Sequence, residues 1–237
     1  MNALAGAKLG IIHAAVFTVQ VVQPYIDELL PGVAISHLAD DTLQQSNLAA
    51  PPGCIPLANF ATFTSYAQTL ERHGMDLIML ACSTFNQAVE LAQPMLVTPL
   101  LQIDRPMMDR AVALGRRIGL VATLPSTVPS SRRLLARAAG DAGASITVTT
   151  VLCQEAFAAL RAGDRDRHNL LLMEAIEQLA GTVDCIVLAQ VSMAAIEPLL
   201  SASRVPVLTS GRTGFTRARE LLLGRTARPP AAGTTGS

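Results

Sequence analysis

Short apolar runs alternate along the chain with longer stretches of amphipathic sequence. An apolar run of about four to eight residues is typical of a buried strand, and apolar positions spaced three and four apart are typical of a helix. The pattern predicts strands over residues 8–14, 33–38, 76–82, 95–101, 117–123, 146–152, 184–190 and 205–209. It predicts helices over 18–30, 57–73, 85–91, 103–115, 129–142, 155–180, 191–203 and 217–223. This alternation predicts an α/β protein with mostly parallel sheets flanked by helices.

Two stretches of the sequence resemble each other. The run DLIMLACST at 76–84 is matched 108 residues later by DCIVLAQVS at 184–192, so that Gln190 falls where Cys82 would. A similar offset recurs at Gly10 and Gly119, which are 109 residues apart, and at Pro99 and Pro206, which are 107 apart. These spacings predict an ancient duplication and two pseudo-symmetric lobes with an active site in the cleft between them.

The offsets also suggest where the lobes divide. We assign residues 1–102 to a first lobe, completed by the segment 205–225, and residues 103–204 to a second lobe. The last ten residues, 228–237, are rich in Pro, Gly, Thr and Ser and have little to bury, so they are predicted to be disordered.

Charge and hydropathy exclude several classes of partner. The formal net charge is zero and 15% of the residues are charged, which gives no electrostatic footprint for nucleic acid or an anionic membrane surface. The longest apolar stretch, 9–22, is interrupted by polar residues and is shorter than the ~20 residues of a membrane-spanning helix. It does not have the layout of a signal peptide either, so we expect a cytoplasmic protein.

Cysteine and lysine usage narrows the chemistry further. The four cysteines show no Cys-x-x-Cys or Cys/His ligand spacing, so we expect free thiols and no metal site. Lys8 is the only lysine and stands at the start of the first predicted strand, opposite the end where chemistry is expected. Pyridoxal phosphate enzymes need a Schiff-base lysine in the pocket, so we expect that this cofactor is not used.

The strongest candidate for chemistry is Cys82. It stands at the carboxyl end of a predicted strand, is followed by Ser83 and Thr84, and precedes a predicted helix. In open parallel sheets ligands bind beyond the carboxyl ends of the strands, where the N–H groups of the next helix are free. The structural alternatives are a small buried thiol for Cys82 and helix capping for the two hydroxyls.

Other polar residues have simpler interpretations. Asp40 and Asp41 are expected in a loop, as a turn or a cap. The turn Gly211-Arg212-Thr213-Gly214 resembles a phosphate cradle but lacks a Walker pattern. Cys54, Cys153 and Cys185 are expected to be structural, and Cys185 begins a predicted strand far from its active end.

Four segments together resemble the aspartate/glutamate racemase superfamily, which includes hydantoin racemase, maleate isomerase and arylmalonate decarboxylase. They are GIIHA at 10–14, ACST at 81–84, GLVAT at 119–123 and LAQVSM at 188–193. The resemblance implies a two-lobed fold in which one cysteine from each lobe faces the α-carbon of a small carboxylate, without metal or cofactor. Homodimers are common in that superfamily, but the sequence leaves the oligomeric state open.

The resemblance also implies roles for individual residues. Cys82 matches the first catalytic cysteine, and the groups expected to bind the substrate are Ser83, Thr84, Thr123, Gln190, Val191 and Ser192. Gln190 stands where the second cysteine is expected. A glutamine has no titratable proton, so it can hold an oxyanion but cannot act as a base.

With glutamine in place of the second cysteine, racemisation needs another group to deliver the second proton. A reaction that uses a single acid or base does not. Removing the α-proton of a carboxylate requires a base and donors that stabilise an ene-diolate, and we expect the helix after Cys82 to lower its pKa and favour a thiolate. His13, at the end of a neighbouring strand, is the first candidate for the second catalytic group, and His168 is the next. Otherwise a one-base isomerisation, decarboxylation or elimination is expected. A carboxylate-binding protein without catalysis is the third alternative.

Overall fold

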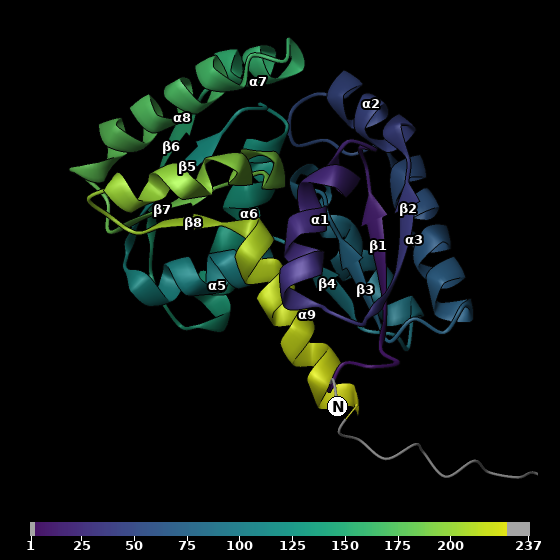
Figure 1. The fold of residues 1–237 in the computed structure, drawn as a ribbon. Helices are drawn as coiled ribbons and strands as arrows, with labels where there is room; N and C mark the ends of the chain where they lie inside the picture. The colour runs from purple at the N-terminus through teal and green to yellow at the C-terminus, as the bar shows by residue number, and fades with distance from the viewer. Residues whose placement is uncertain (1–2, 227–237) are drawn as a thin grey trace, which may run out of the picture.

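Two parallel sheets of four strands each form the framework of the protein, seen in a computed structural model that describes residues 3–226 (Figure 1). The first sheet has the order β2-β1-β3-β4 and the second has the order β6-β5-β7-β8. The strands are β1 (Lys8–His13), β2 (Ala34–Ala39), β3 (Leu77–Leu80), β4 (Leu100–Gln102), β5 (Arg117–Ala122), β6 (Thr147–Leu152), β7 (Cys185–Leu188) and β8 (Val207–Thr209). The predicted α/β class is confirmed, and the tail predicted to be disordered lies outside the described residues.

Helices flank both sheets. They are α1 (Thr18–Leu29), α2 (Asp41–Ala49), α3 (Leu57–Arg72), α4 (Gln87–Ala92), α5 (Arg105–Leu114), α6 (Thr127–Asp141), α7 (Gln154–Arg161), α8 (Arg165–Ala180) and α9 (Ser210–Thr226). Three segments are 3-10 helices: η1 (Ser83–Phe85), η2 (Gln93–Met95) and η3 (Val191–Ala202). No helix within 3–226 is long and apolar enough to cross a lipid bilayer.

Helix α2 was not predicted, because its apolar positions are too few to show a helical period. Its start is fixed locally: Asp40 is the N-cap, and its carboxylate accepts a hydrogen bond from the Thr42 N–H at 2.9 Å. Asp40 is thus a cap, one of the two roles expected of it. Strand β4 is shorter than predicted and begins only at Leu100, since η2 and a loop occupy the residues before it.

The two sheets repeat the same local contacts at matched positions. A side chain at Gly10 would meet Leu70 of α3 at 2.8 Å, and one at Gly119 would meet Leu179 of α8 at 3.1 Å. A strand glycine therefore lets a leucine of the covering helix pack closely in both halves. Asp76 accepts a hydrogen bond from the N–H of Lys8, the first residue of β1. Asp184 likewise accepts one from the N–H of Arg117, the first residue of β5.

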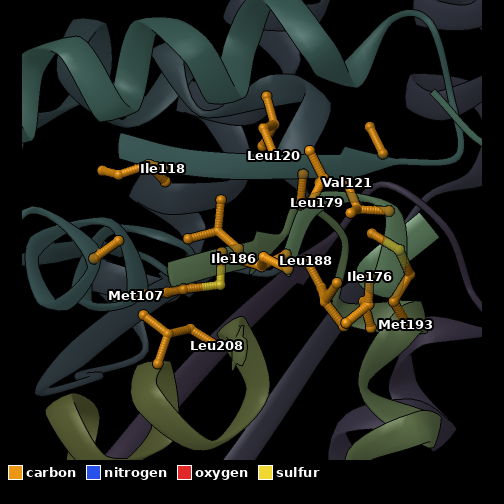
Figure 2. Close-up of a cluster of buried hydrophobic side chains, with 14 of the residues drawn as sticks. Met107, Ile118, Leu120, Val121, Ile176, Leu179, Ile186, Leu188, Met193 and Leu208 are labelled. Atoms are coloured by element: carbon orange, nitrogen blue, oxygen red, sulfur yellow. The ribbon is translucent and has the colours of Figure 1, made fainter. Parts of the chain in front are cut away.

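Each half has its own apolar core. In the second half, side chains of β5, β7, α5 and α8 interlock, as Figure 2 shows for Leu120, Ile186, Met107 and Leu179. The segment predicted to complete the first lobe is divided: β8 pairs with β7 in the second sheet, while α9 packs through Phe215 into the first-half core. The exact lobe boundaries stay a prediction.

Candidate functional site

Cys82 lies directly beyond the carboxyl end of β3, as the sequence predicted. Its backbone is still extended, and η1 begins at the next residue. The residue as a whole is half-buried, and its side chain packs against the apolar cluster that contains Leu80 and Phe85. The backbone N–H groups of Thr84 and Phe85 donate toward the sulfur. This geometry gives a half-buried thiol at a strand end that two backbone donors orient.

The predicted acidity of Cys82 is wrong. Burial raises the pKa of the thiol from about 9 to about 12. The N–H groups of Thr84 and Phe85 lower the pKa, but they do not outweigh desolvation, and the nearby Asp104 raises it further. The segment after the cysteine is a single 3-10 turn of three residues, so it has little of the helix dipole that was expected to lower this pKa. At neutral pH the resting group is a protonated thiol.

Asp104 is a neighbour that the sequence analysis missed. It follows β4 at the same edge of the sheet and is fully buried. The Asn86 side chain donates to its Oδ2 at 3.1 Å. Burial raises the pKa of this carboxyl, while the hydrogen bond from Asn86 acts in the opposite direction. The sequence pattern assigned Asp104 to the helix after β4, so its position close to Cys82 could not be predicted.

Gln190 stands at the matching place in the second half, beyond β7, and its orientation is fixed. Its Oε1 accepts hydrogen bonds from the backbone N–H of Thr123 at 2.7 Å and from the Thr123 hydroxyl at 2.9 Å. Because a backbone N–H can only donate, the amide oxygen must face Thr123. The two N–H bonds of Nε2 then point away from it, and no partner for them lies within 3–226. Gln190 thus presents a pair of donors.

The loop after β3, which contains Cys82, and the loop after β7, which contains Gln190, meet at the boundary between the halves. Val191, directly after Gln190, is buried in the same apolar cluster as Ala81, directly before Cys82. The Oγ1 atoms of Thr84 and Thr127 lie 3.1 Å apart across the same boundary. The Val191 side chain therefore packs into the first-half core, which leaves only its backbone for the binding role expected of it. Ser192 is buried beside it.

His13 does not have the free nitrogen that a second proton donor needs. The Thr18 hydroxyl donates to Ala15 O, so His13 Nδ1–H donates to Thr18 Oγ1 at 2.7 Å. The other nitrogen, Nε2, then accepts from His37 Nδ1–H at 2.9 Å. Burial, and secondly His37, lowers the pKa of His13 to about 4. His13 is thus neutral with both nitrogens occupied, which argues against the predicted catalytic role.

The remaining candidates lie elsewhere. His168 is buried on α8 of the second half, where its Nδ1 lies 3.1 Å from Asn169 Oδ1. The turn after β8 is packed rather than open: a side chain at Gly211 would lie 2.4 Å from the Tyr25 ring, and Arg212 pairs with Glu28. Among residues 3–226, no three His, Cys, Asp or Glu side chains are grouped to hold a metal.

The fold is a parallel α/β fold in two halves, with a thiol beyond one strand and Gln190 at the matching place beyond its counterpart. A sequence model described as Asp/Glu/Hydantoin racemase matches residues 46–218, and the chain belongs to this family. No curated protein sequence matches the chain.

Solved structures of racemases share the fold. Glutamate racemase from Thermus thermophilus, in complex with β-chloro-D-alanine, is similar with a TM-score of 0.70 and 20% identity over 95% of this chain and 84% of that one. Aspartate racemase from Picrophilus torridus has a TM-score of 0.66 and 16% identity over 92% and 99%. Allantoin racemase from Klebsiella pneumoniae has a TM-score of 0.65 and 16% identity over 98% and 97%. At this identity the likeness concerns the fold.

Proposed function

We propose that the protein is a cofactor-independent isomerase of the racemase or epimerase type, which transfers a proton at the α-carbon of a small carboxylate through Cys82. The family to which the chain belongs supports the reaction class. The observation that carries the proposal is the placement of one half-buried thiol beyond β3, in the first half, and one fixed amide donor beyond β7, at the matching position of the second half.

We assign two roles in the site: hydrogen-bond donors stabilise the ene-diolate, and Cys82 transfers the proton. An ene-diolate carries its negative charge on the carboxyl oxygens, and preorganised donors stabilise it. The Nε2 donors of Gln190 and the hydroxyls of Ser83 and Thr84 serve this purpose, together with the backbone N–H groups beside Cys82, while the Thr123 hydroxyl donates to Gln190 Oε1 and holds that amide in place. Cys82 exchanges the proton with carbon. The sulfur first loses its own proton to water, because its raised pKa keeps it protonated at rest, and it then takes the α-proton. Inversion is completed when water delivers a proton to the opposite face of the ene-diolate.

Lysine placement supports the proposal that no Schiff base is involved. Lys8 is the first residue of β1, whereas Cys82 follows the far end of the neighbouring strand β3. The only lysine amine in the sequence therefore starts at the opposite edge of the sheet. A reaction that uses the thiol and the hydrogen-bond donors has no need of this amine.

One observation favours a second function. Cys82 is a protonated thiol at rest, and Gln190 has no proton to exchange. This pair suits a cofactor-free decarboxylase: the substrate loses carbon dioxide, the electron pair of the broken C–C bond forms an ene-diolate held by the donors, and the thiol then protonates the carbon. Water returns the proton to sulfur. The same site without either reaction would be a carboxylate-binding protein.

Deuterium exchange tests the proposal. We expect amino acids, hydantoins or arylmalonates incubated with the protein in deuterated water to incorporate deuterium at the α-carbon, as followed by proton NMR. Cys82→Ser should abolish this exchange, whereas Cys153→Ser, a thiol beside α8, should not change it. Loss of optical rotation without carbon dioxide release identifies a racemase, and carbon dioxide release identifies the decarboxylase. Binding without exchange of any candidate would contradict both.

A further inference from the structure

A long 3-10 helix, η3 (Val191–Ala202), begins directly after Gln190 at the boundary between the two halves. Runs of this helix type longer than three or four residues are uncommon, and η3 has 12 residues. The matching segment of the first half differs: η1 has only three residues, and the α-helix α4 begins at Gln87. Because the motif before these helices is repeated, contacts outside it must select the 3-10 form in the second half.

The period of η3 divides its side chains between the two halves. A 3-10 helix has three residues per turn, so positions three apart share one face. Val191 and Ala194 are buried in the first-half core, and Glu197, three residues further on, accepts a hydrogen bond from the first half. Met193 and Ile196 are buried in the second-half core, as Figure 2 shows for Met193. The helix is therefore a wedge whose two faces pack against different halves.

One carboxylate oxygen joins the two halves at Glu197. Its Oε1 accepts a hydrogen bond from the Tyr25 hydroxyl of α1 at 2.8 Å, and another from Thr209 Oγ1 at the end of β8. The Tyr25 ring is held in place, because it stacks on Phe215 with the ring centroids 6.0 Å apart and fills the space beside Gly211. Burial, and secondly the hydrogen bond to Glu197, raises the pKa of Tyr25, so the phenol stays a donor at neutral pH.

This contact and the helix type depend on each other. An α-helix turns about 100° per residue, so Glu197, six residues after Val191, would face about 120° away from the stripe that meets the first half. It would also lie only about 9 Å along the axis from Val191, instead of about 12 Å. The Tyr25 hydroxyl therefore meets Glu197 only while η3 keeps the 3-10 form, and the hydrogen bond in turn stabilises that form.

We propose that the Tyr25–Glu197 hydrogen bond is a latch that holds η3 in the 3-10 form. Gln190 is the N-cap residue of η3, so the latch also fixes where Gln190 stands relative to the Cys82 loop. Tyr25 and Glu197 are then positioning residues, which act on the site through the helix rather than by touching the substrate. The role of the latch in the reaction rests on the proposed function, whereas its effect on η3 is a property of the fold.

A distance measurement tests the latch without catalysis. Nitroxide labels at Leu57→Cys on α3 and Leu199→Cys on η3, where the native side chains are 84% and 45% exposed, report the position of η3 by pulsed electron paramagnetic resonance. The four native cysteines are replaced by serine or alanine. We expect one narrow distance distribution for the latched protein. Tyr25→Phe should shift the mean by about 3 Å, or add a population displaced by that amount, as a change from 3-10 to α geometry would give.

Matched variants separate the latch from a general loss of stability. Tyr66→Phe removes the other tyrosine hydroxyl, which donates to Asp40 at 2.8 Å within the first half, and should leave the distance unchanged. Glu197→Gln keeps an acceptor oxygen and should behave as the wild type, whereas Glu197→Ala should behave as Tyr25→Phe. An unchanged distance in both Tyr25→Phe and Glu197→Ala, or the same shift in Tyr66→Phe, would overturn the inference.

Deuterium exchange at the α-carbon gives the second readout, in the protein with its native cysteines. Tyr25→Phe should slow the exchange at least about tenfold and Tyr66→Phe by no more than about twofold, because only the first displaces a group at the site. A shifted distance with unchanged exchange would overturn the positioning role. A wild-type protein that exchanges no α-hydrogen would instead contradict the proposed function, and the distance distributions would still decide whether the latch exists.

Discussion

The raised pKa of Cys82 makes a quantitative prediction about its reactivity in the protein without ligand. Only a thiolate attacks an alkylating reagent. A thiol with the usual pKa of about 9 is ionised in about one molecule in ten at pH 8, but one with a pKa of about 12 is ionised in only about one in ten thousand. The difference in thiolate population is about a thousandfold.

Intrinsic nucleophilicity recovers part of this loss. A thiolate of higher pKa is the stronger nucleophile, with a Brønsted coefficient of about 0.4–0.5, which gives back roughly 20-fold over this interval. We therefore expect Cys82 to react with iodoacetamide about 50-fold more slowly at pH 8 than a free thiol of ordinary pKa. The rate should still rise about tenfold per pH unit at pH 9, where the free thiol is levelling off.

The assay measures alkylation of Cys82 alone. A variant that combines Cys54→Ser, Cys153→Ser and Cys185→Ala leaves one thiol, and mass spectrometry of the labelled peptide gives the rate between about pH 6 and pH 10. N-acetylcysteine is the matched free thiol, and circular dichroism at each pH controls for unfolding. A rate that levels off near pH 7 would refute the reasoning, since it would show that the N–H groups of Thr84 and Phe85 outweigh desolvation.

Two further predictions concern stability. Because burial raises the pKa of Asp104 in the folded state above its unfolded value of about 3.9, the native state favours the protonated carboxyl, and this contribution is complete at low pH and lost as pH rises through the folded pKa. The free energy of unfolding of Asp104→Asn relative to wild type, from urea titrations, should therefore increase from about pH 4 upward, and a decrease would contradict the burial argument. Gly211→Ala should cost about 1–3 kcal/mol, because its Cβ would lie 2.4 Å from the Tyr25 ring, which is held by a 2.8 Å hydrogen bond to Glu197. Gly224→Ala on the same helix has open space and should be neutral or stabilising by up to about 1 kcal/mol, so equal effects of the two changes on thermal unfolding would count against it.

Sequence patterning predicted the fold well because burial on both faces of a parallel sheet leaves a strong local signal. The strands appear as apolar runs, and the 108-residue offset between the two motif stretches reappears as two sheets of identical strand order. Helix α2 was not predicted, because its start is fixed by the N-cap at Asp40 and it has no apolar stripe that a sequence pattern could show.

The candidate site was predicted in part. The place of Cys82 beyond β3 follows from the sequence, because an apolar run that stops at polar residues marks the carboxyl end of a strand. The place of Asp104 did not, because its short strand β4 is hardly distinguishable from the loop and helix around it. That Thr84 and Arg133 line one small pocket could not be predicted either, since the two residues come from opposite halves of the chain.

The sequence by itself determined which residues stand at strand ends, because that depends on periodicity along the chain. It did not determine their protonation or orientation. His13 was expected to exchange protons, yet the packing of β1 against β2 places His37 on one nitrogen and Thr18 occupies the other. Only the tertiary structure decided that Cys82 rests as a thiol and that Gln190 turns its donors away from Thr123, because desolvation and hydrogen bonding depend on neighbours distant in sequence.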